Sequence, residues 1–406
     1  MIGNTIKNCL KWLVLCAVAG ICSGIIGAWF SLGVEAVTEL RIRFDCLIYF
    51  LPLGGVLSVL VYRLFKTNGQ GTNNVLKAMR GEGEVSPKLA PSIFTAALFS
   101  HLFGASVGRE GAAVQIGGSL AAFLSKIFKL EKEEIRILTY CGMAGVFSAV
   151  FGTPFAAVFF ALEVAVVGKI YIKAIVPTLL TSICAYFTSV FLGTRPERFK
   201  IEELGKTNAL SVAKTVLIVI AAAALSIAFC YVLKFGKSFF QRLFKWEIVK
   251  IAAGAIVIVL LTLAVGTKDY SGAGTSVIEA VFAGEETQKA AFLIKFVFTA
   301  IAVSAGFKGG EIIPTLFIGA TFGAFAASLL GIPTALGGLV GLTAMFCGAT
   351  NCLFASIVLS LELFSGKGAG FVIMAAVISF FISGKISLYS AQKHNKKRFN
   401  LPYEFE

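Results

Sequence analysis

The stretch Gly108-Arg109-Glu110-Gly111-Ala112-Ala113-Val114-Gln115-Ile116-Gly117-Gly118 places an acidic residue between glycines in a strongly apolar chain. An ionisable side chain at membrane depth is costly, so it usually faces a water-filled cavity and marks an ion or proton pathway. The run from Ala112 to Lys129 predicts a helix, whose unpaired N-terminal amides and positive dipole end attract an anion. The carboxylate of Glu110 on that N-terminus would take the place of an anion. We interpret it as a gate that leaves when it is protonated.

A simpler interpretation is that Arg109 and Glu110 form an ion pair in a loop, and that the glycines only allow close helix packing. Short motifs often match by chance. The remainder of the chain is needed to choose between the two interpretations.

The composition predicts an all-α polytopic membrane protein. Of 406 residues, 57% are hydrophobic and 14% are charged, with a mean hydropathy of +0.86, against roughly 45–50% and 25% in soluble domains. The formal net charge is +14. Basic residues gather at the edges of apolar segments, which fits cytoplasmic loops beside anionic lipid better than a nucleic-acid interface. Examples are Lys7, Lys11, Lys126, Lys129, Arg136, Lys234, Lys237, Arg242 and the tail 393–398.

Nothing in the sequence predicts a metal site or a cofactor. The nine cysteines lie in apolar runs without CxxC spacing, so we expect them to behave as small hydrophobic residues. His101 and His394 are the two histidines. We expect His101 to be a packed polar residue, with proton transfer as the alternative. The first apolar run continues through Phe30, which is too long for the core of a signal peptide and predicts the first membrane helix.

Twelve apolar segments are long enough to cross or enter a membrane. Two of them contain breaks, at Gly152-Thr153-Pro154 and at Gly348-Ala349-Thr350-Asn351. Broken helices are tolerated at membrane depth only where the backbone is buried in protein or lines a cavity. The segments are 12–36, 47–65, 89–107, 112–129, 135–166, 172–193, 208–235, 247–266, 289–305, 313–331, 335–364 and 368–386.

Three landmarks recur in the same order about 200 residues apart, which predicts two related halves. They are 69–78 with 272–280, Gly-Arg-Glu110 with Gly-Gly-Glu311, and 153–163 with 352–362. We expect one transmembrane domain over residues 1–406, with halves at about 12–193 and 208–390. About twelve polar residues follow the last predicted helix, so we expect no cytoplasmic regulatory domain. Repeated halves with interrupted helices indicate a transporter whose site lies between them at the midplane.

The acids Glu163 and Glu362 end the two repeated segments 153–163 and 352–362. Each is either a helix-end acid bonded to backbone amides or a participant in transport, and the sequence leaves both interpretations open.

With these motifs in view, nearly the whole chain resembles the CLC family of anion channels and anion/proton antiporters. Gly108-Arg109-Glu110-Gly111 matches the family's gating-glutamate motif, with Ala112 where proline is usual. Lys308-Gly309-Gly310-Glu311-Ile312-Ile313-Pro314 matches the later filter motif, and Ser387-Leu388-Tyr389 matches the position of a tyrosine that binds the central anion. The resemblance implies an inverted repeat of tilted helices and a homodimer with one anion pathway in each subunit.

The departures from the family pattern point to its fluoride-exporting branch. Gly69-Gln70-Gly71-Thr72-Asn73 stands where chloride-selective members carry Gly-Ser-Gly-Ile-Pro, so the serine that bonds chloride is absent. Glu311 is an acid inside the second filter motif, as in the fluoride branch, although the methionine often found near the serine position is missing. Val164 stands where chloride/proton exchangers carry a proton-relay glutamate. The resemblance implies an anion-binding set of Gln70, Gly71, Thr72, Asn73, Gly108, Arg109, Gly111, Ile312, Ile313 and Tyr389.

Fluoride is small and holds water tightly, so its site needs many short hydrogen bonds. Gln70, Asn73, Asn74 and Tyr389 carry amide and hydroxyl donors. Each of the amide residues could instead serve only the local turn. Glu311 is a possible second acid, since a protonated carboxyl donates a hydrogen bond to an anion. The alternative is that Glu311 caps a helix and pairs with Lys308.

We therefore predict a secondary active anion/proton antiporter of the plasma membrane that exports fluoride, with Glu110 as gate and proton carrier. The alternative within the same fold is a chloride channel or a chloride/proton exchanger. We expect no metal-ligand cluster, no Gly-x-Ser-x-Gly nucleophile elbow and no sizeable soluble domain in this chain, and therefore neither a membrane enzyme nor a sensor.

Overall fold

The apolar runs form α-helices throughout the described part of the chain, which comprises residues 2–201, 204–205, 208–395 and 404–405 of the computed structural model. In lipid a chain must satisfy its backbone hydrogen bonds internally, and a helix does so within one segment. Seven of the described helical segments are long and apolar enough to cross a membrane. The all-α prediction is confirmed.

The elements before residue 200 are α1 (Ile2–Arg43), a 3-10 helix (Asp45–Phe50), α2 (Leu51–Leu64), α3 (Thr72–Met79), α4 (Leu89–Leu102), α5 (Glu110–Ile127), α6 (Lys132–Phe151), α7 (Pro154–Val164), β1 (Val166–Val167), β2 (Lys169–Ile170) and α8 (Ile172–Phe191). Those after it are α9 (Ala209–Leu243), α10 (Glu247–Val265), α11 (Thr275–Phe282), α12 (Ala291–Ala305), α13 (Ile312–Leu330), α14 (Thr334–Thr350), α15 (Leu353–Leu363), α16 (Ala369–Ser383), β3 (Lys393–His394) and β4 (Glu404–Phe405).

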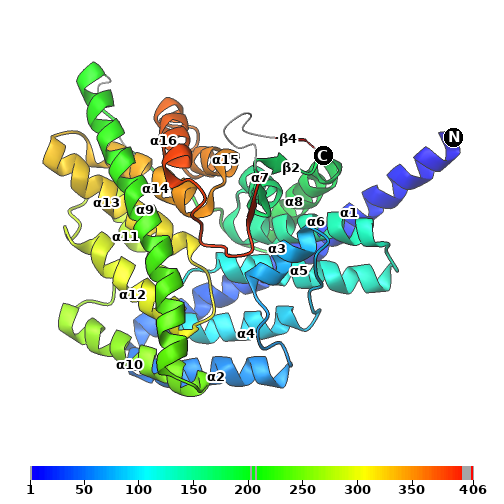
Figure 1. Cartoon of the computed structure of the whole chain (residues 1–406), viewed down its shortest axis with the longest axis horizontal. Coiled ribbons are helices and arrows are strands. Elements are labelled where there is room, and N and C mark those ends of the chain that lie inside the picture. The colour runs from blue at the N-terminus through cyan, green and yellow to red at the C-terminus, as the bar shows by residue number, and fades with distance from the viewer. Residues whose placement is uncertain (1, 202–203, 206–207, 396–403, 406) are drawn as a thin grey trace.

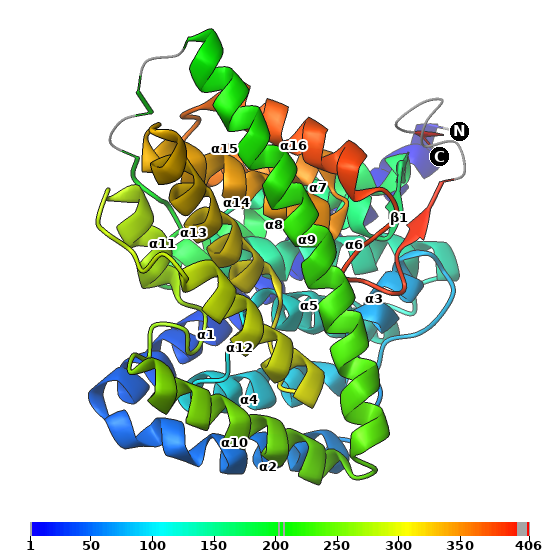
Figure 2. The same ribbon diagram turned by 60° about the vertical axis from the view of Figure 1, so that its left-hand side comes forward.

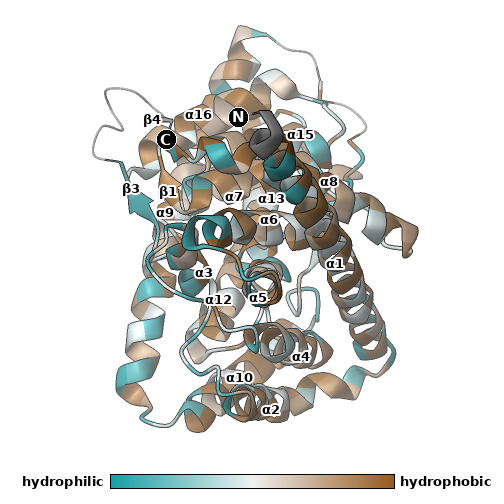
Figure 3. Ribbon diagram, turned by 90° about the vertical axis from the view of Figure 1, so that its right-hand side faces the viewer, coloured by the Kyte–Doolittle hydropathy of each residue, from teal (hydrophilic) through white to brown (hydrophobic). Residues whose placement is uncertain are grey.

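Helices that are separated in the sequence lie side by side. In both ribbon views α2 packs along α10, and the long α9 crosses the molecule beside α12 and α13 (Figures 1 and 2). Most of α1 is hydrophobic in Figure 3. The large apolar side chains of Leu13 and Trp29, both in α1, are exposed. An apolar outer surface of this kind suits contact with lipid.

Both predicted helix breaks are confirmed. α6 ends at Gly152, whose φ is +69°, and Pro154 begins α7. α14 ends at Asn351, whose φ is +57°, and α15 begins at Leu353. A left-handed residue ends a helix, and a proline in the first turn of the next helix has no N–H that would need a partner.

Some predicted boundaries differ from the structure. α1 and α9 extend beyond the predicted segments 12–36 and 208–235, because hydropathy marks the apolar part of a helix and not its polar ends. The short helices α3 and α11 occupy the repeated motifs near 69–78 and 272–280. Each has only eight residues, so a search for membrane-length segments misses both.

The two halves meet through a backbone pair at their central motifs. Gly108 and Gly310 form an antiparallel bridge in which each N–H donates to the carbonyl of the other, both at 2.7 Å. Arg109 is the N-cap residue of α5 and Glu311 is the N-cap residue of α13, and neither side chain accepts a capping hydrogen bond from the described backbone. The bridge therefore makes Glu311 the counterpart of Arg109. The sequence comparison aligned Glu311 with Glu110, which is wrong by one residue because it followed the acids and not the paired glycines.

Glycines bring the helices of each central pair into close contact. A Cβ on Gly117 of α5 would lie 2.2 Å from the carbonyl oxygen of Gly142 in α6. In the other half, a Cβ on Gly323 of α13 would lie 2.0 Å from the carbonyl oxygen of Gly337 in α14. Small residues at such crossings allow the backbones to touch, which is how membrane helices associate without a hydrophobic driving force. These contacts fix the positions of α5 and α13.

The acids Glu163 and Glu362 cap each other's helices. The carboxylate of Glu163, on α7, accepts from the N–H groups of Phe354 and Ala355 at 3.1 and 2.7 Å, at the start of α15. The carboxylate of Glu362, on α15, accepts from Phe155 and Ala156 at 3.2 and 2.7 Å, at the start of α7. Of the two open interpretations, the structure shows the bond to backbone amides, made across the repeat.

We expect Glu163→Ala and Glu362→Ala each to lower the free energy of unfolding by about 1–2 kcal/mol, because each leaves two helix N-terminal amides without an acceptor. The corresponding glutamine variants keep an acceptor oxygen and should lose less. Thermal unfolding of the detergent-solubilised protein measures the difference. Glu286→Ala, at an exposed position, is the matched control. Unchanged melting of both alanine variants would show that these caps do not stabilise the fold.

Candidate functional site

Glu110 is completely buried at the first turn of α5, and its carboxylate lies on the N-terminus of α13. Its Oε1 accepts a hydrogen bond of 2.9 Å from the N–H of Ile313. The sequence placed this carboxylate on the amides of its own helix, whereas this hydrogen bond comes from the helix of the other half. An unpaired amide at a helix start is a natural anion site, so the side chain occupies a position suited to an anion.

Two glycines make room for the Glu110 carboxylate. A Cβ on Gly108 or on Gly310 would lie 2.3 Å from Oε2 of Glu110. Oε2 itself is buried and has no hydrogen-bond partner among the described residues. The carboxylate is thus held through one oxygen, in a space that only glycine backbone leaves open.

Arg109 does not pair with Glu110 in any hydrogen bond or ion pair of the described residues, so the loop ion pair is wrong. Its guanidinium forms an ion pair with Glu197, lies 3.6 Å from a carboxylate oxygen of Glu35, and donates to Ser31 at 3.0 Å. The side chain also lies over the ring of Phe151. These contacts hold Arg109 away from the carboxylate next to it in sequence.

We call the position of the Glu110 carboxylate on the amide of Ile313 the Glu110 seat. A cavity lies on each side of this seat. The first, which we call the Arg109 cavity, has a volume of about 710 Å³ and is lined by Arg109 and Ile313 among others. The second, the Tyr389 cavity, has a volume of about 300 Å³ and is lined by Gly309, Glu311 and Tyr389 among others. Glu311 lines the Tyr389 cavity, and Ile313, two residues later, lines the Arg109 cavity. The start of α13 therefore separates the two cavities at the level of Glu110.

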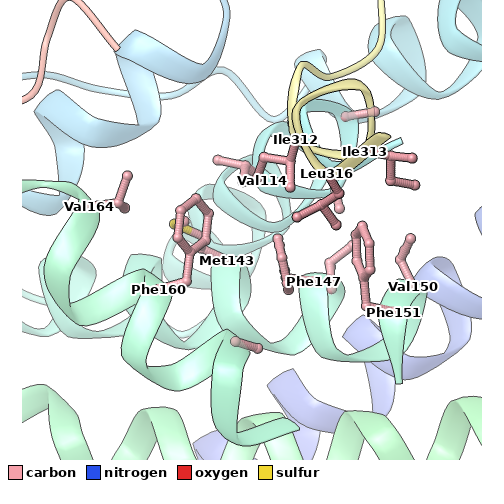
Figure 4. Packing of buried hydrophobic residues seen from close by; sticks show 14 of the residues in the cluster. Val114, Met143, Phe147, Val150, Phe151, Phe160, Val164, Ile312, Ile313 and Leu316 are labelled. Atoms are coloured by element: carbon pink, nitrogen blue, oxygen red, sulfur yellow. The ribbon is translucent and has the colours of Figure 1, made fainter. Parts of the chain in front are cut away.

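Apolar side chains pack around the starts of α5 and α13. Figure 4 shows Val114 and Leu316 near Phe147 of α6 and Phe160 of α7, all in one buried cluster. The ring of Phe160 also lies 6.4 Å from that of Tyr389. Because the surrounding side chains are apolar, the polar groups at the starts of α5 and α13 are backbone amides and the Glu110 carboxylate.

The predicted residues of the first filter motif line the Tyr389 cavity: Gln70, Gly71, Thr72 and Asn73. The side-chain oxygen of Gln70 accepts from the N–H of Ser86 at 3.2 Å, and the side-chain oxygen of Asn74 accepts from the N–H of Gly71 at 3.1 Å. These bonds shape the turn before α3, as the structural alternative predicted. Of the remaining predicted residues, Gly108, Gly111, Ile312 and Ile313 lie at the starts of α5 and α13 around Glu110, whereas the Arg109 side chain lies away from its carboxylate.

Asn73 holds the segment that carries Tyr389. Its amide nitrogen donates to Ser390 at 3.0 Å, and its oxygen accepts from the N–H of Ala391 at 3.0 Å. Tyr389 is 7% exposed and lines the cavity, as the resemblance implied. Asn73 therefore contributes to this site by positioning Tyr389.

Sequence reasoning missed Gln115, which lies one turn beyond Glu110 in α5. Its amide nitrogen donates to the carbonyl of Gly111 at 3.0 Å and to Thr72 at 3.3 Å, and its oxygen accepts from Tyr62 at 3.4 Å. It is buried and lines the Tyr389 cavity. The sequence did contain a signal for this residue: a lone side-chain amide in an apolar helix close to Glu110. Because buried amides nearly always have hydrogen-bond partners, Gln115 could have been predicted to bond other groups near Glu110.

Glu311 faces the Tyr389 cavity and forms an ion pair with Lys237 of α9 at 3.6 Å. The prediction that Glu311 pairs with Lys308 is wrong, because the ammonium of Lys308 lies over the ring of Tyr62, 4.2 Å from the ring centre. Three lysines, Lys237, Lys250 and Lys308, line this cavity with Glu311. Their excess positive charge favours entry of an anion.

The segment Gly104-Ala105-Ser106-Val107-Gly108 matches the Gly-x-Ser-x-Gly spacing of hydrolase nucleophiles, so the expectation that the chain lacks this motif is wrong at the level of sequence spacing. A nucleophile of that type is exposed at a sharp turn between a strand and a helix. Ser106 is completely buried, and its hydroxyl is 3.0 Å from that of Thr299. The match therefore lacks the structural context of a nucleophile elbow.

A buried carboxylate between two cavities, in an inverted repeat of broken helices, has the architecture of a multi-pass ion-transport protein of the cell membrane. The family model described as voltage gated chloride channel matches residues 53–384. The chain belongs to this CLC family.

Relatives support this assignment along the whole chain. A chloride/fluoride channel protein of Pseudomonas syringae pv. tomato is 32% identical, over 97% of this chain and 89% of its own. The crystal structure of a CLC-type fluoride/proton antiporter matches with a TM-score of 0.91 and 31% identity, over 95% of this chain and 98% of that one. An H(+)/Cl(-) exchange transporter, ClcA, of Yersinia pseudotuberculosis is 26% identical, over 96% of this chain and 88% of its own.

We expect Gly310→Ala to reduce ion flux by about tenfold or more, an added barrier of at least ~1.4 kcal/mol. The new methyl group would lie 2.3 Å from Oε2 of Glu110 and 2.4 Å from the nitrogen of Gly111, so it displaces the carboxylate from its seat. Flux from proteoliposomes measures the effect. Gly370→Ala, where nothing lies within 4 Å of the added Cβ, is the control. A folded Gly310→Ala protein with the flux of the parent would contradict the seat.

Proposed function

We propose that the protein is a secondary active anion/proton antiporter that exports fluoride, with Glu110 as both the gate and the proton carrier. The observation that carries this proposal is the position of the Glu110 carboxylate, on the amide of Ile313 and between two cavities. A side chain in that position competes with a transported anion for one donor. It also has two aqueous routes by which to exchange a proton.

In the proposed cycle, the ionised carboxylate of Glu110 accepts from Ile313 and closes the path between the cavities. A proton entering from one cavity neutralises it, which weakens its attraction to the helix N-terminus. An anion then takes the amide, and the protonated side chain moves aside. Release of the proton to the opposite cavity restores the carboxylate and expels the anion. The anion and the proton thus move in opposite directions because they use the same seat at different times.

The assignment to fluoride is supported by the polar groups of the filter and by two relatives. The first filter motif carries Gln70 where chloride-selective members carry serine, and Val164 is buried where their relay glutamate would stand. The similar chloride/fluoride channel protein and CLC-type fluoride/proton antiporter point to the same anion. Hydrogen fluoride enters cells as a neutral acid and dissociates inside, so proton-coupled export would remove the trapped ion.

The proposal includes a homodimer with one pathway in each subunit, as the family resemblance implies. Chloride/proton exchange is the second candidate, because the similar ClcA is named as an exchanger of that type. Halide preference separates the two candidates. Fluoride and chloride efflux from proteoliposomes, with pH recorded and the membrane voltage clamped, tests the proposal. Chloride flux equal to or above fluoride flux would favour the second candidate.

We expect Glu110→Gln to abolish proton-coupled transport, because the amide imitates the neutral acid and carries no exchangeable acidic proton. A pH gradient should then drive no uphill anion movement, while downhill anion flux persists. The same efflux assay, run with and without a pH gradient, measures both quantities. Glu286→Gln at an exposed position is the matched control. Uphill anion transport by Glu110→Gln would show that another residue carries the proton.

We expect Glu311→Gln to lower proton-coupled transport by about tenfold or more, the effect of losing a group that transfers protons. Its acid faces the Tyr389 cavity beside Lys237 and can take a proton there on the way to Glu110. Lys237→Gln removes the same ion pair but keeps the acid, so it should lower proton-coupled transport less than Glu311→Gln does. A folded, dimeric Glu311→Gln protein with the activity and coupling of the parent would leave Glu311 only its pairing role.

A further inference from the structure

Three polar side chains that line the Arg109 cavity have buried atoms without a hydrogen-bond partner among the described residues. These atoms are Nη1 of Arg41, Nε2 of His101 and Oγ of Ser271. His101 is 1% exposed and Ser271 is 4% exposed. Buried polar groups in native proteins nearly always have a partner, so an unpaired group calls for an explanation. Three of them around one cavity point to a ligand.

The three side chains come from different segments, and the backbone next to Ser271 meets the backbone that follows His101 beside Arg41. The guanidinium of Arg41 lies against two glycines: a Cβ on Gly104 would be 3.3 Å from Nη1, and one on Gly272 would be 2.7 Å from it. Gly104 is three residues after His101, and Gly272 directly follows Ser271. The N–H of Gly272 donates to the carbonyl of Gly104 at 3.4 Å, which joins the two backbones beneath Arg41.

The charge around this point is positive. Directly behind Gly272, the fully buried Lys295 donates to the carbonyls of Gly272 and Tyr270, at 2.6 and 3.1 Å. No ion pair of the described residues joins Arg41 or Lys295 to a carboxylate. A basic side chain without an acidic partner in a low-dielectric interior attracts an anion strongly.

Carboxylates also line the Arg109 cavity, but they are exposed or already paired. Glu197 pairs with Arg109, to which Glu35 is also close, and Asp45 pairs with Lys268 at 2.6 Å. The remaining acids of this lining, which are Glu39, Asp269 and Glu279, are exposed. The acids therefore lie toward water, whereas His101 and Ser271 are buried.

We propose that Arg41, His101 and Ser271 form a second anion-binding site in the Arg109 cavity, separate from the seat of Glu110. Its ligand is a small inorganic anion of the halide class, held by the guanidinium of Arg41 and the hydroxyl of Ser271, with His101 lining the site beside them. The site uses side chains of α1, α4 and the loop before α11, and none of the backbone amides that start α5 and α13. It holds the anion that has passed Glu110, or the next one to pass. The inference rests on the proposed function in that an anion passes through this cavity.

Anion binding to the detergent-solubilised dimer, measured by titration calorimetry with sodium fluoride and with sodium chloride at constant ionic strength, tests the site. We expect Arg41→Gln to weaken binding by about tenfold or more, as for loss of a charged hydrogen bond. Arg41→Lys, which keeps the positive charge, should retain part of the anion affinity that Arg41→Gln loses. Ser271→Ala removes only a hydroxyl and should weaken binding without affecting folding. Lys268→Gln, which removes an exposed positive charge from the same cavity, is the matched control.

The measurement is repeated in the Glu110→Gln background, where the gate seat is free. Loss of binding on Arg41→Gln in both backgrounds supports a site that is independent of the gate. If Arg41→Gln and Ser271→Ala bind both halides as the parent does, these donors hold only water and the inference is wrong. If binding is lost for chloride but fluoride is never bound, the site stands and the fluoride assignment fails. If Glu110→Gln still couples protons, the gate fails and the binding result is unaffected.

Discussion

The pair of backbone hydrogen bonds between Gly108 and Gly310 is the constraint on which the rest of the site depends. Each N–H donates to the other carbonyl at 2.7 Å, deep in an apolar protein where no water would replace the bond. The pair brings the starts of α5 and α13 together, so two positive helix ends face one small space. Glycine is required there because any Cβ would strike the carboxylate that occupies this space. The position of Glu110 thus follows from the backbone.

The same bridge explains how two related halves produce an asymmetric site. It makes Arg109 the counterpart of Glu311, and Glu110 the counterpart of Ile312. Because the halves are inverted, Arg109 faces one cavity and Glu311 faces the other. The first half supplies the carboxylate of this shared seat, and the second half supplies the N–H of Ile313 that donates to it. A symmetric backbone therefore carries a single buried carboxylate at this level instead of two competing ones.

The sequence was sufficient for the fold class, the helix breaks and the position of Glu110 at a helix start, because each depends on local signals: apolar length, glycine and proline, and an acid at membrane depth. It was insufficient for partners that are distant in the chain. Pairing Arg109 with Glu110, or Glu311 with Lys308, assumed that neighbours in sequence are neighbours in space, whereas the actual partners Glu197 and Lys237 lie in other segments. The alignment of the halves was one residue off because a shared acid is a weaker guide than a backbone pair.

The surroundings of Glu110 also indicate which part of the site is able to move. Glycine contacts press α5 against α6 and α13 against α14, and Glu163 and Glu362 tie α7 to α15 through reciprocal caps. Close-packed interiors of this kind deform little. The carboxylate of Glu110, in contrast, is held by one oxygen, and its other oxygen has no partner among the described residues. A rotation of this side chain breaks one hydrogen bond, whereas opening the helices would break many. The motion of lower energy at this place is therefore the rotation of the side chain.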